Sequence, residues 1–284
     1  MDTKKVAIVT DSSAYIPPDA LTGLDVTVIP LWLIWDGENL RDGVDIDPPR
    51  FYQRLKIAKN LPTTSQPTPN DFINIFKKLA EKADSIVAVL LSSKISGTHA
   101  SAVMAQNQLQ DTDIRIVDSE SSSMGLGFSV LAAAKAAAMG KLVDEVVAAA
   151  ETMRDKLHFF FMVDTLDFLY RSGRIKATKR ILGTILNIKP MLQFKDGLIQ
   201  SLASERTMGK AIARMLDIAE ERLGGKKMAE AAVVDIDCPD RGNRVAEMIK
   251  ERFSPQKILR SEVSPLVGNV VGPGAFGVAF YAES

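Results

Sequence analysis

In the first half of the chain, short apolar runs alternate with longer segments in which apolar residues recur at helical spacing. Residues 5–10, 85–91 and 114–117 are short apolar runs, which predict buried strands. Segments with apolar residues at helical spacing lie between these runs, and two alanine-rich helices are expected after them, at 125–139 and 143–156. Strands that alternate with helices at this pace need crossover connections. The pattern therefore predicts an α/β fold whose mainly parallel sheet has helices on both faces.

Proline and polar residues locate several element boundaries within this half. The apolar run at 26–35 predicts a second strand with a bend or an edge at Pro30, because proline cannot donate to a sheet ladder. Asp47 and Thr68 each stand directly before proline, which is typical of a capped helix start.

The second half repeats the mixture of strands and helices and predicts a second α/β domain. An apolar run begins at 159, and Asp196-Gly197 between two alternating runs predicts a hairpin. The further expected elements are a helical piece between Gly173 and Gly183, a helix at 207–223, then strand, helix and strand at 229–236, 240–252 and 256–262, and a last strand at 276–281. We expect domains at 1–160 and 161–284, with a return of the last strand to the first domain as the alternative.

Composition narrows the class of protein. The 284 residues carry 35 Lys and Arg against 35 Asp and Glu, so the basic excess typical of nucleic-acid binders is absent. Cys238 is the sole cysteine, which excludes an intrachain disulfide. No apolar run approaches the length of a bilayer span, and the one after Lys5 is too short for a secretion signal. We expect a cytoplasmic protein without stable membrane insertion.

Two apparent motifs do not support their usual chemistry. Residues 272–277 spell G-x-G-x-x-G, but the chain ends seven residues after Gly277, too soon for the helix and acidic residue of a dinucleotide site. We expect a tight loop that leads into a strand. His99 and His158 lie far apart, and no Cys/His cluster is present, so no metal site is predicted.

Two hydroxyl-rich loops are better candidates for a binding site. The loop at 91–98 follows a predicted strand and opens a helix, with Ser96 as the expected N-cap. A helix start favours anions, and ligands of parallel α/β sheets usually bind at the carboxyl ends of the strands. The loop at 62–68 is similarly polar. Together they suggest an anion held by hydroxyls and amides, although Ser96 could serve its helix alone.

The chain resembles the DegV family of fatty-acid-binding proteins over essentially its whole length. The motifs that carry the resemblance occur in order: 9–13 (VTDSS), 64–67 (TSQP), 92–98 (SSKISGT), 118–119 (DS), 124–127 (MGLG), 172–175 (SGRI), 188–190 (IKP) and 272–274 (GPG). The resemblance implies two α/β domains with an acyl chain buried between them. It also implies that a separate fatty acid kinase, similar to dihydroxyacetone kinases, receives the acid for phospholipid synthesis.

Site residues follow from the same resemblance. Thr64 and Ser96 match positions that hold the fatty-acid carboxylate, and Arg206 matches an arginine near the head group. Val270 stands where many members have a histidine, so Asn269 is the expected replacement donor. The full candidate set is Thr64, Ser93, Ser96, Gly97, Arg206 and Asn269. The expected ligand is a long-chain fatty acid such as palmitate, with no cofactor and no catalytic residue.

An enzyme is the alternative. It would act on acyl or phosphate esters with Ser96 or Asp11 as nucleophile, although no second aspartate follows two positions after Asp11 and no G-x-S-x-G elbow surrounds Ser96. A nucleic-acid-binding or regulatory module is a third class, which the neutral net charge disfavours.

Overall fold

The computed structural model describes residues 5–175 and 188–283. The chain forms two compact units, one of residues 1–155 with 264–266 and one of residues 156–263 with 267–284. The helical piece expected between Gly173 and Gly183 lies largely outside the described residues.

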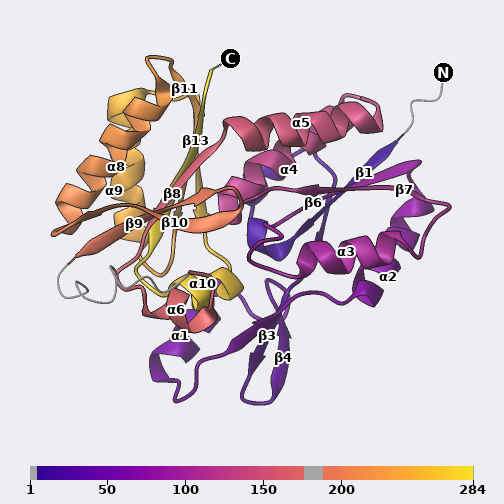
Figure 1. The fold of residues 1–284 in the computed structure, drawn as a ribbon, viewed down its shortest axis with the longest axis horizontal. Coiled ribbons are helices and arrows are strands. Elements are labelled where there is room, and N and C mark those ends of the chain that lie inside the picture. The colour runs from indigo at the N-terminus through magenta and orange to yellow at the C-terminus, as the bar shows by residue number, and fades with distance from the viewer. Residues whose placement is uncertain (1–4, 176–187, 284) are drawn as a thin grey trace. The chain divides into compact units, whose positions relative to one another are not determined.

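The first unit is built on a four-stranded sheet in the order β2-β1-β6-β7 (Figure 1). Its strands are β1 (Val6–Asp11), β2 (Val26–Ile29), β6 (Ser85–Leu90) and β7 (Asp113–Asp118). Every neighbouring pair is parallel. All six residues of β6 are buried, which is expected of a central parallel strand covered on both faces. The predicted fold class is therefore confirmed.

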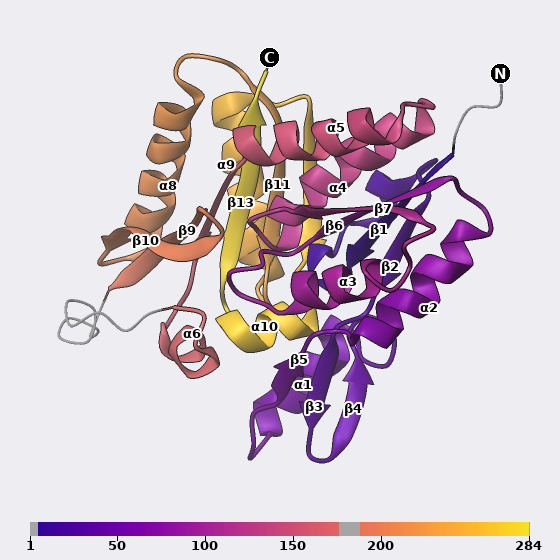
Figure 2. The same ribbon diagram turned by 45° about the vertical axis from the view of Figure 1, so that its right-hand side comes forward.

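Helices cover both faces of this sheet (Figure 2). One face meets α2 (Pro69–Ala80) and α3 (Thr98–Gln106), whose apolar side chains pack against strand residues such as Val9 and Ile86. The other face meets α4 (Ser123–Ala138) and α5 (Val143–Lys156). The start of α2 was predicted correctly: the Thr68 hydroxyl accepts from the Asp71 amide, and the Asp71 carboxylate accepts from the Thr68 amide, as in a capping box.

A small antiparallel sheet extends the first unit. It has the order β4-β3-β5 and consists of β3 (Trp32–Trp35), β4 (Glu38–Arg41) and β5 (Thr63–Ser65). The prediction of one bent strand at 26–35 was wrong, because the chain leaves the parallel sheet near Pro30 and pairs elsewhere as β3. Helix α1 (Pro48–Ile57) begins after Asp47 as expected and packs Phe51 against Trp35, with ring centroids 5.5 Å apart.

The second unit contains a six-stranded sheet in the order β10-β9-β8-β13-β11-β12. Its strands are β8 (His158–Met162), β9 (Lys189–Lys195), β10 (Leu198–Glu205), β11 (Met228–Asp235), β12 (Lys257–Glu262) and β13 (Phe276–Ala282). The hairpin between β9 and β10 turns at Asp196 and Gly197, both with positive φ, as predicted. The last strand, β13, pairs with β8 and β11 and stays in this sheet.

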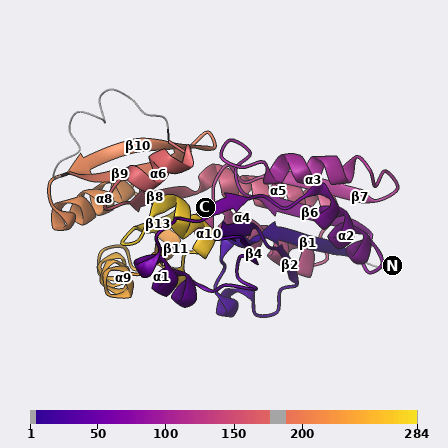
Figure 3. The same cartoon turned by 90° about the horizontal axis from the view of Figure 1, so that it is seen from below.

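Side chains on β8 alternate between the two faces of the sheet. Phe160 and Met162 join a core formed with α8 (Met208–Leu223) and α9 (Pro239–Phe253), which lie against the sheet (Figure 3). Phe159 and Phe161 face the other way with Phe194, and the stacked rings of Phe159 and Phe194 lie 5.8 Å apart.

The remaining described helices are short: α6 (Asp167–Ser172), α10 (Pro265–Val271) and two 3-10 helices at Ser12–Ala14 and Pro18–Leu21. The sequence reading missed α10. The glycine motif at 272–277 is a loop leading into β13, with positive φ at Gly272 and Gly274, as expected. Helices within the described residues all fall short of the length and apolarity that a membrane crossing needs.

Candidate functional site

The carboxyl edge of the parallel sheet gathers aspartate and serine side chains. Asp11 ends β1 and is fully buried. One carboxylate oxygen, Oδ1, accepts hydrogen bonds from the Ser13 amide at 3.0 Å and the Ser13 hydroxyl at 2.5 Å. The other, Oδ2, accepts from the Leu91 amide at 2.8 Å. Burial raises the pKa of Asp11 to about 6, although these hydrogen bonds act in the opposite direction.

A second buried carboxylate, Asp42, lies directly after β4. Its Oδ2 accepts from the Ser12 hydroxyl at 2.7 Å, and its Oδ1 accepts from the Leu266 amide at 3.4 Å. The Ser264 hydroxyl is a further hydrogen-bond partner. Burial raises the pKa of Asp42 to about 7, and the charge of Asp11 adds a smaller increase. These bonds fasten the loop after β1, the small sheet and residues 264–266 to one another.

The loop before α3 has a geometry different from the one predicted. The N-cap of α3 is Gly97, so the expectation that Ser96 caps the helix was wrong. The Ser96 hydroxyl instead shares a 2.9 Å hydrogen bond with the Thr98 hydroxyl and accepts from the Thr98 amide at 3.3 Å. The reason is a turn at Ser92, whose carbonyl accepts from the Ser96 amide at 3.2 Å, so the helix begins one residue later than predicted. Ser96 is half-buried, with its oxygen at the helix start.

The structure brings the two hydroxyl-rich loops together within the first unit. Thr64 lies on β5 opposite Leu33 and is half-buried, so this part of the predicted loop is a strand. Two residues later, the Gln66 side chain passes over Gly97, where an added Cβ would lie 3.0 Å from Gln66 Nε2. Glycine therefore allows the 62–68 segment to approach the start of α3 closely.

Ser93, in the same loop, is exposed, and its amide donates to the Asp118 carboxylate at 3.2 Å.

Arg206 and Asn269 belong to the second unit. Arg206 is exposed between β10 and α8, and its side chain makes no hydrogen bond or ion pair with any residue that the structure describes. Asn269 is half-buried on α10. Their roles at a head group stay predictions.

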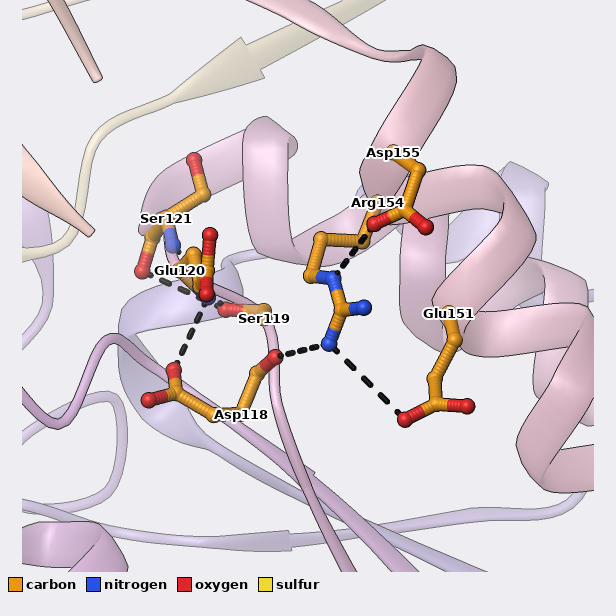
Figure 4. Close-up of polar contacts among 7 residues, drawn as sticks. All are labelled: Asp118, Ser119, Glu120, Ser121, Glu151, Arg154 and Asp155. Atoms are coloured by element: carbon orange, nitrogen blue, oxygen red, sulfur yellow. Dashed lines mark hydrogen bonds and ion pairs between the residues drawn. The ribbon is translucent and has the colours of Figure 1, made fainter. Parts of the chain in front are cut away.

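A further serine-rich loop lies between β7 and α4 (Figure 4), and it was not among the predicted site residues. Its Ser121 carbonyl accepts from the Ser92 amide at 2.8 Å, which joins it to the loop before α3. The hydroxyls of Ser121 and Ser123 are buried without a hydrogen-bond partner among the described residues. Consecutive serines at 119 and 121–123 before a glycine-containing helix were the available sequence signal.

Comparison with known proteins places this arrangement in a family. The model of the DegV family, described as "Uncharacterised protein, DegV family", matches residues 5–283. The chain belongs to the DegV family. A DegV domain-containing protein of Streptomyces coelicolor is 40% identical over 278 residues, which cover 97% of this chain and 98% of that protein.

Solved DegV structures agree with the fold over the whole chain. A fatty-acid-binding DegV family protein of Thermus thermophilus superimposes with a TM-score of 0.91 at 31% identity, covering 98% of this chain and 100% of that one. DegV of Bacillus subtilis, a fatty acid binding protein, gives a TM-score of 0.90 at 30% identity, covering 99% and 100%. The predicted membership of the DegV family is thus confirmed.

Proposed function

We propose that this protein binds one long-chain fatty acid, with its carboxylate at Thr64 and Ser96 and its acyl chain buried. The observation that carries the proposal is that both DegV structures named above, each about 30% identical over nearly the whole chain, are fatty-acid-binding proteins. Palmitate is a suitable test ligand.

The head-group chemistry supports this assignment. Thr64 and Ser96 are half-buried hydroxyls from segments that the contact between Gln66 and Gly97 holds together. Ser96 lies directly before Gly97, the N-cap of α3, and a helix start carries unpaired amides and a partial positive charge. A carboxylate removed from water needs several such donors. Arg206 is the proposed charge partner, and Asn269 the proposed donor at the position next to Val270.

An acyl tail supplies enough driving force for tight binding. Burial contributes about 0.8 kcal/mol per methylene, so a chain of roughly fifteen contributes on the order of 12 kcal/mol. Ordering the flexible tail and losing its free motion offset a large part of this gain. The favourable free energy that remains after these costs is consistent with submicromolar affinity.

The geometry supports binding better than catalysis. Within the described residues, the Ser96 hydroxyl bonds only to Thr98, so no base activates it as a nucleophile. Asp11 is fully buried, and both of its oxygens already accept hydrogen bonds. As part of the same proposal, the bound acid is presented to a separate kinase that resembles dihydroxyacetone kinases. Because Val270 stands where many family members have a histidine, presentation to a kinase is the part of the proposal that most needs a direct test.

The ligand itself can be identified from purified protein. Denaturing extraction followed by mass spectrometry should release a fatty acid in near one-to-one ratio to the chain. Protein that is emptied by extraction and refolded should take up added palmitate. Protein that repeatedly carries no lipid and fails to take up palmitate would contradict the proposal.

Substitutions test the head-group residues. We expect Ser96→Ala and Thr64→Val each to weaken palmitate binding about fivefold to tenfold, since each removes one hydrogen bond to a charged group. Ser65→Ala is the matched control, because its hydroxyl bonds to the Gln66 carbonyl and neighbouring strand residues point to opposite faces. Titration calorimetry with palmitate measures all three. Equal affinities in Ser96→Ala, Thr64→Val and Ser65→Ala would show that the carboxylate lies elsewhere.

A further inference from the structure

The start of α4 leaves hydrogen-bond donors unused. This helix has 16 residues, and its N-cap residue Ser122 makes no side-chain capping bond. The amides of Ser123 and Met124 therefore have no intrahelical acceptor, whereas the next amide, of Gly125, donates to the Ser122 carbonyl at 3.1 Å. Two hydroxyls stand beside them, from Ser121 with 6% exposure and Ser123 with 3% exposure. Neither hydroxyl has a hydrogen-bond partner among the described residues.

Buried polar groups of this kind point to a bound acceptor. The large majority of buried side-chain polar atoms in native proteins are hydrogen-bonded, and those without a protein partner usually meet water or a ligand. Here the two buried hydroxyls and the free amides at the start of α4 all belong to the four residues from Ser121 to Met124. The two unpaired hydroxyls fit one ligand oxygen with two lone pairs, such as that of a hydroxyl group.

This cluster adjoins the proposed head-group site. The Ser92 amide donates to the Ser121 carbonyl at 2.8 Å, and the Ser92 carbonyl accepts from the Ser96 amide at 3.2 Å. The carboxylate of Asp118 accepts from the amides of Ser93 and Glu120, at 3.2 Å and 2.9 Å. The loops that open α3 and α4 are thus tied to each other at the ends of neighbouring strands β6 and β7.

The surrounding charges favour an uncharged oxygen over an anion. Figure 4 shows Arg154 on α5 reaching the backbone carbonyl of Asp118, at 3.2 Å. The same guanidinium pairs with Asp155 at 2.8 Å and lies 3.9 Å from Glu151. Glu120 on the loop acts on the same guanidinium, so three carboxylates interact with a single arginine, and the Asp118 carboxylate adds a further negative charge to the loop. A second anion would be repelled, whereas a hydroxyl oxygen of a ligand would not.

We propose that the start of α4 is a second subsite, which donates hydrogen bonds to a hydroxyl group close to the carboxyl end of the bound acid. This inference rests on the proposed function and specifies its ligand class. The protein then prefers a long-chain fatty acid hydroxylated near its head to the unsubstituted acid. The carboxylate occupies the start of α3, and the two lone pairs of the ligand's hydroxyl oxygen accept from the hydroxyls of Ser121 and Ser123.

The experiment compares the affinities of the full-length protein for palmitate, 2-hydroxypalmitate, 3-hydroxypalmitate and 16-hydroxypalmitate. We expect one of the first two hydroxy acids to bind about fivefold to tenfold more tightly than palmitate, which is the effect of one or two added hydrogen bonds. The hydroxyl of 16-hydroxypalmitate is at the far end of the chain and should bring no such gain.

Variants locate the preference in the protein. Ser123→Ala and Ser121→Ala should each bring the ratio between the hydroxy acid and palmitate close to one, with little change in palmitate affinity. Ser129→Ala is the matched control, because its hydroxyl is also buried and unpaired but lies further along α4. It should keep the full ratio. Two single variants are used so that poor folding of one does not decide the result.

The outcomes separate this inference from the proposed function. Equal affinity for palmitate and both head-end hydroxy acids would overturn the inference, since the free donors would then bind water only, and would leave fatty-acid binding intact. A preference that persists in Ser121→Ala and Ser123→Ala would overturn it too. Failure to bind any of the four acids would overturn both.

Discussion

Two loops at the same edge of the parallel sheet use the same residue types in opposite ways. After β1, the carboxylate of Asp11 and the hydroxyl of Ser13 are buried and bonded to each other. After β7, the hydroxyls of Ser121 and Ser123 are equally buried and bonded to nothing among the described residues. A serine-rich motif alone cannot distinguish these cases. Saturated hydrogen bonding indicates a structural role, whereas spare donors indicate a place for a ligand.

The strongest test of this contrast is Asp11→Ala. It leaves three buried donors without an acceptor, the Leu91 amide and the amide and hydroxyl of Ser13. We expect a loss of about 3–5 kcal/mol in the free energy of unfolding. Urea denaturation monitored by circular dichroism measures it. Asp11→Asn, which keeps one acceptor oxygen, should lose less. An unchanged midpoint for Asp11→Ala would remove the distinction between the two loops.

The titration of Asp42 gives a second test. Burial raises its pKa from 3.8 to about 7, so the folded protein holds this proton more tightly than the unfolded chain does. Its contribution to stability is therefore complete below about pH 4 and is lost as the pH rises towards and through about 7. Asp11, whose pKa is raised to about 6, contributes in the same direction at slightly lower pH.

Asp42→Asn should remove most of this pH dependence. We expect the difference in unfolding free energy between wild type and variant to change steadily from about pH 5 to about pH 7 and to level off above it, with wild type relatively weaker at high pH. Urea midpoints across that range measure it. Asp45→Asn is the control, since Arg41 lowers the pKa of Asp45 to about 2 and the group stays charged throughout the range. A constant difference for Asp42→Asn would show that Asp42 does not titrate there.

Local patterns in the sequence predicted those parts of the fold that depend on neighbouring residues. The Asp196-Gly197 hairpin and the helix start at Thr68 were correct because their signals involve adjacent positions. An irregularity at Pro30 was expected, but the sequence does not show that the residues before and after it belong to different sheets. That choice depends on pairing partners such as β5, which lie about thirty residues away along the chain.

The site was predicted less completely for a related reason. Thr64 and Ser96 were predicted through resemblance and stay predictions as head-group residues, although their loops do meet. The cap at Ser96 was wrong because a turn at Ser92 competes with the helix. Asp42 reads as an ordinary surface turn residue. Its partners are 30 and 224 positions away, so no local pattern reveals its burial.

The smallest expected effect comes from comparing two serines directly. Ser13→Ala removes a buried donor to the Asp11 carboxylate, so we expect a loss of about 1–3 kcal/mol in unfolding free energy and no direct effect on ligand affinity. Ser96→Ala removes a half-buried hydroxyl that bonds only within its own turn, so the loss should stay below about 1 kcal/mol while palmitate affinity falls. Urea denaturation of the ligand-free variants measures the first quantity and calorimetry the second. If Ser96→Ala destabilised the free protein more than Ser13→Ala, its hydroxyl would be part of the structural hydrogen-bond network. Complete hydrogen bonding would then no longer distinguish the structural residues at this edge of the sheet from the ligand-binding ones.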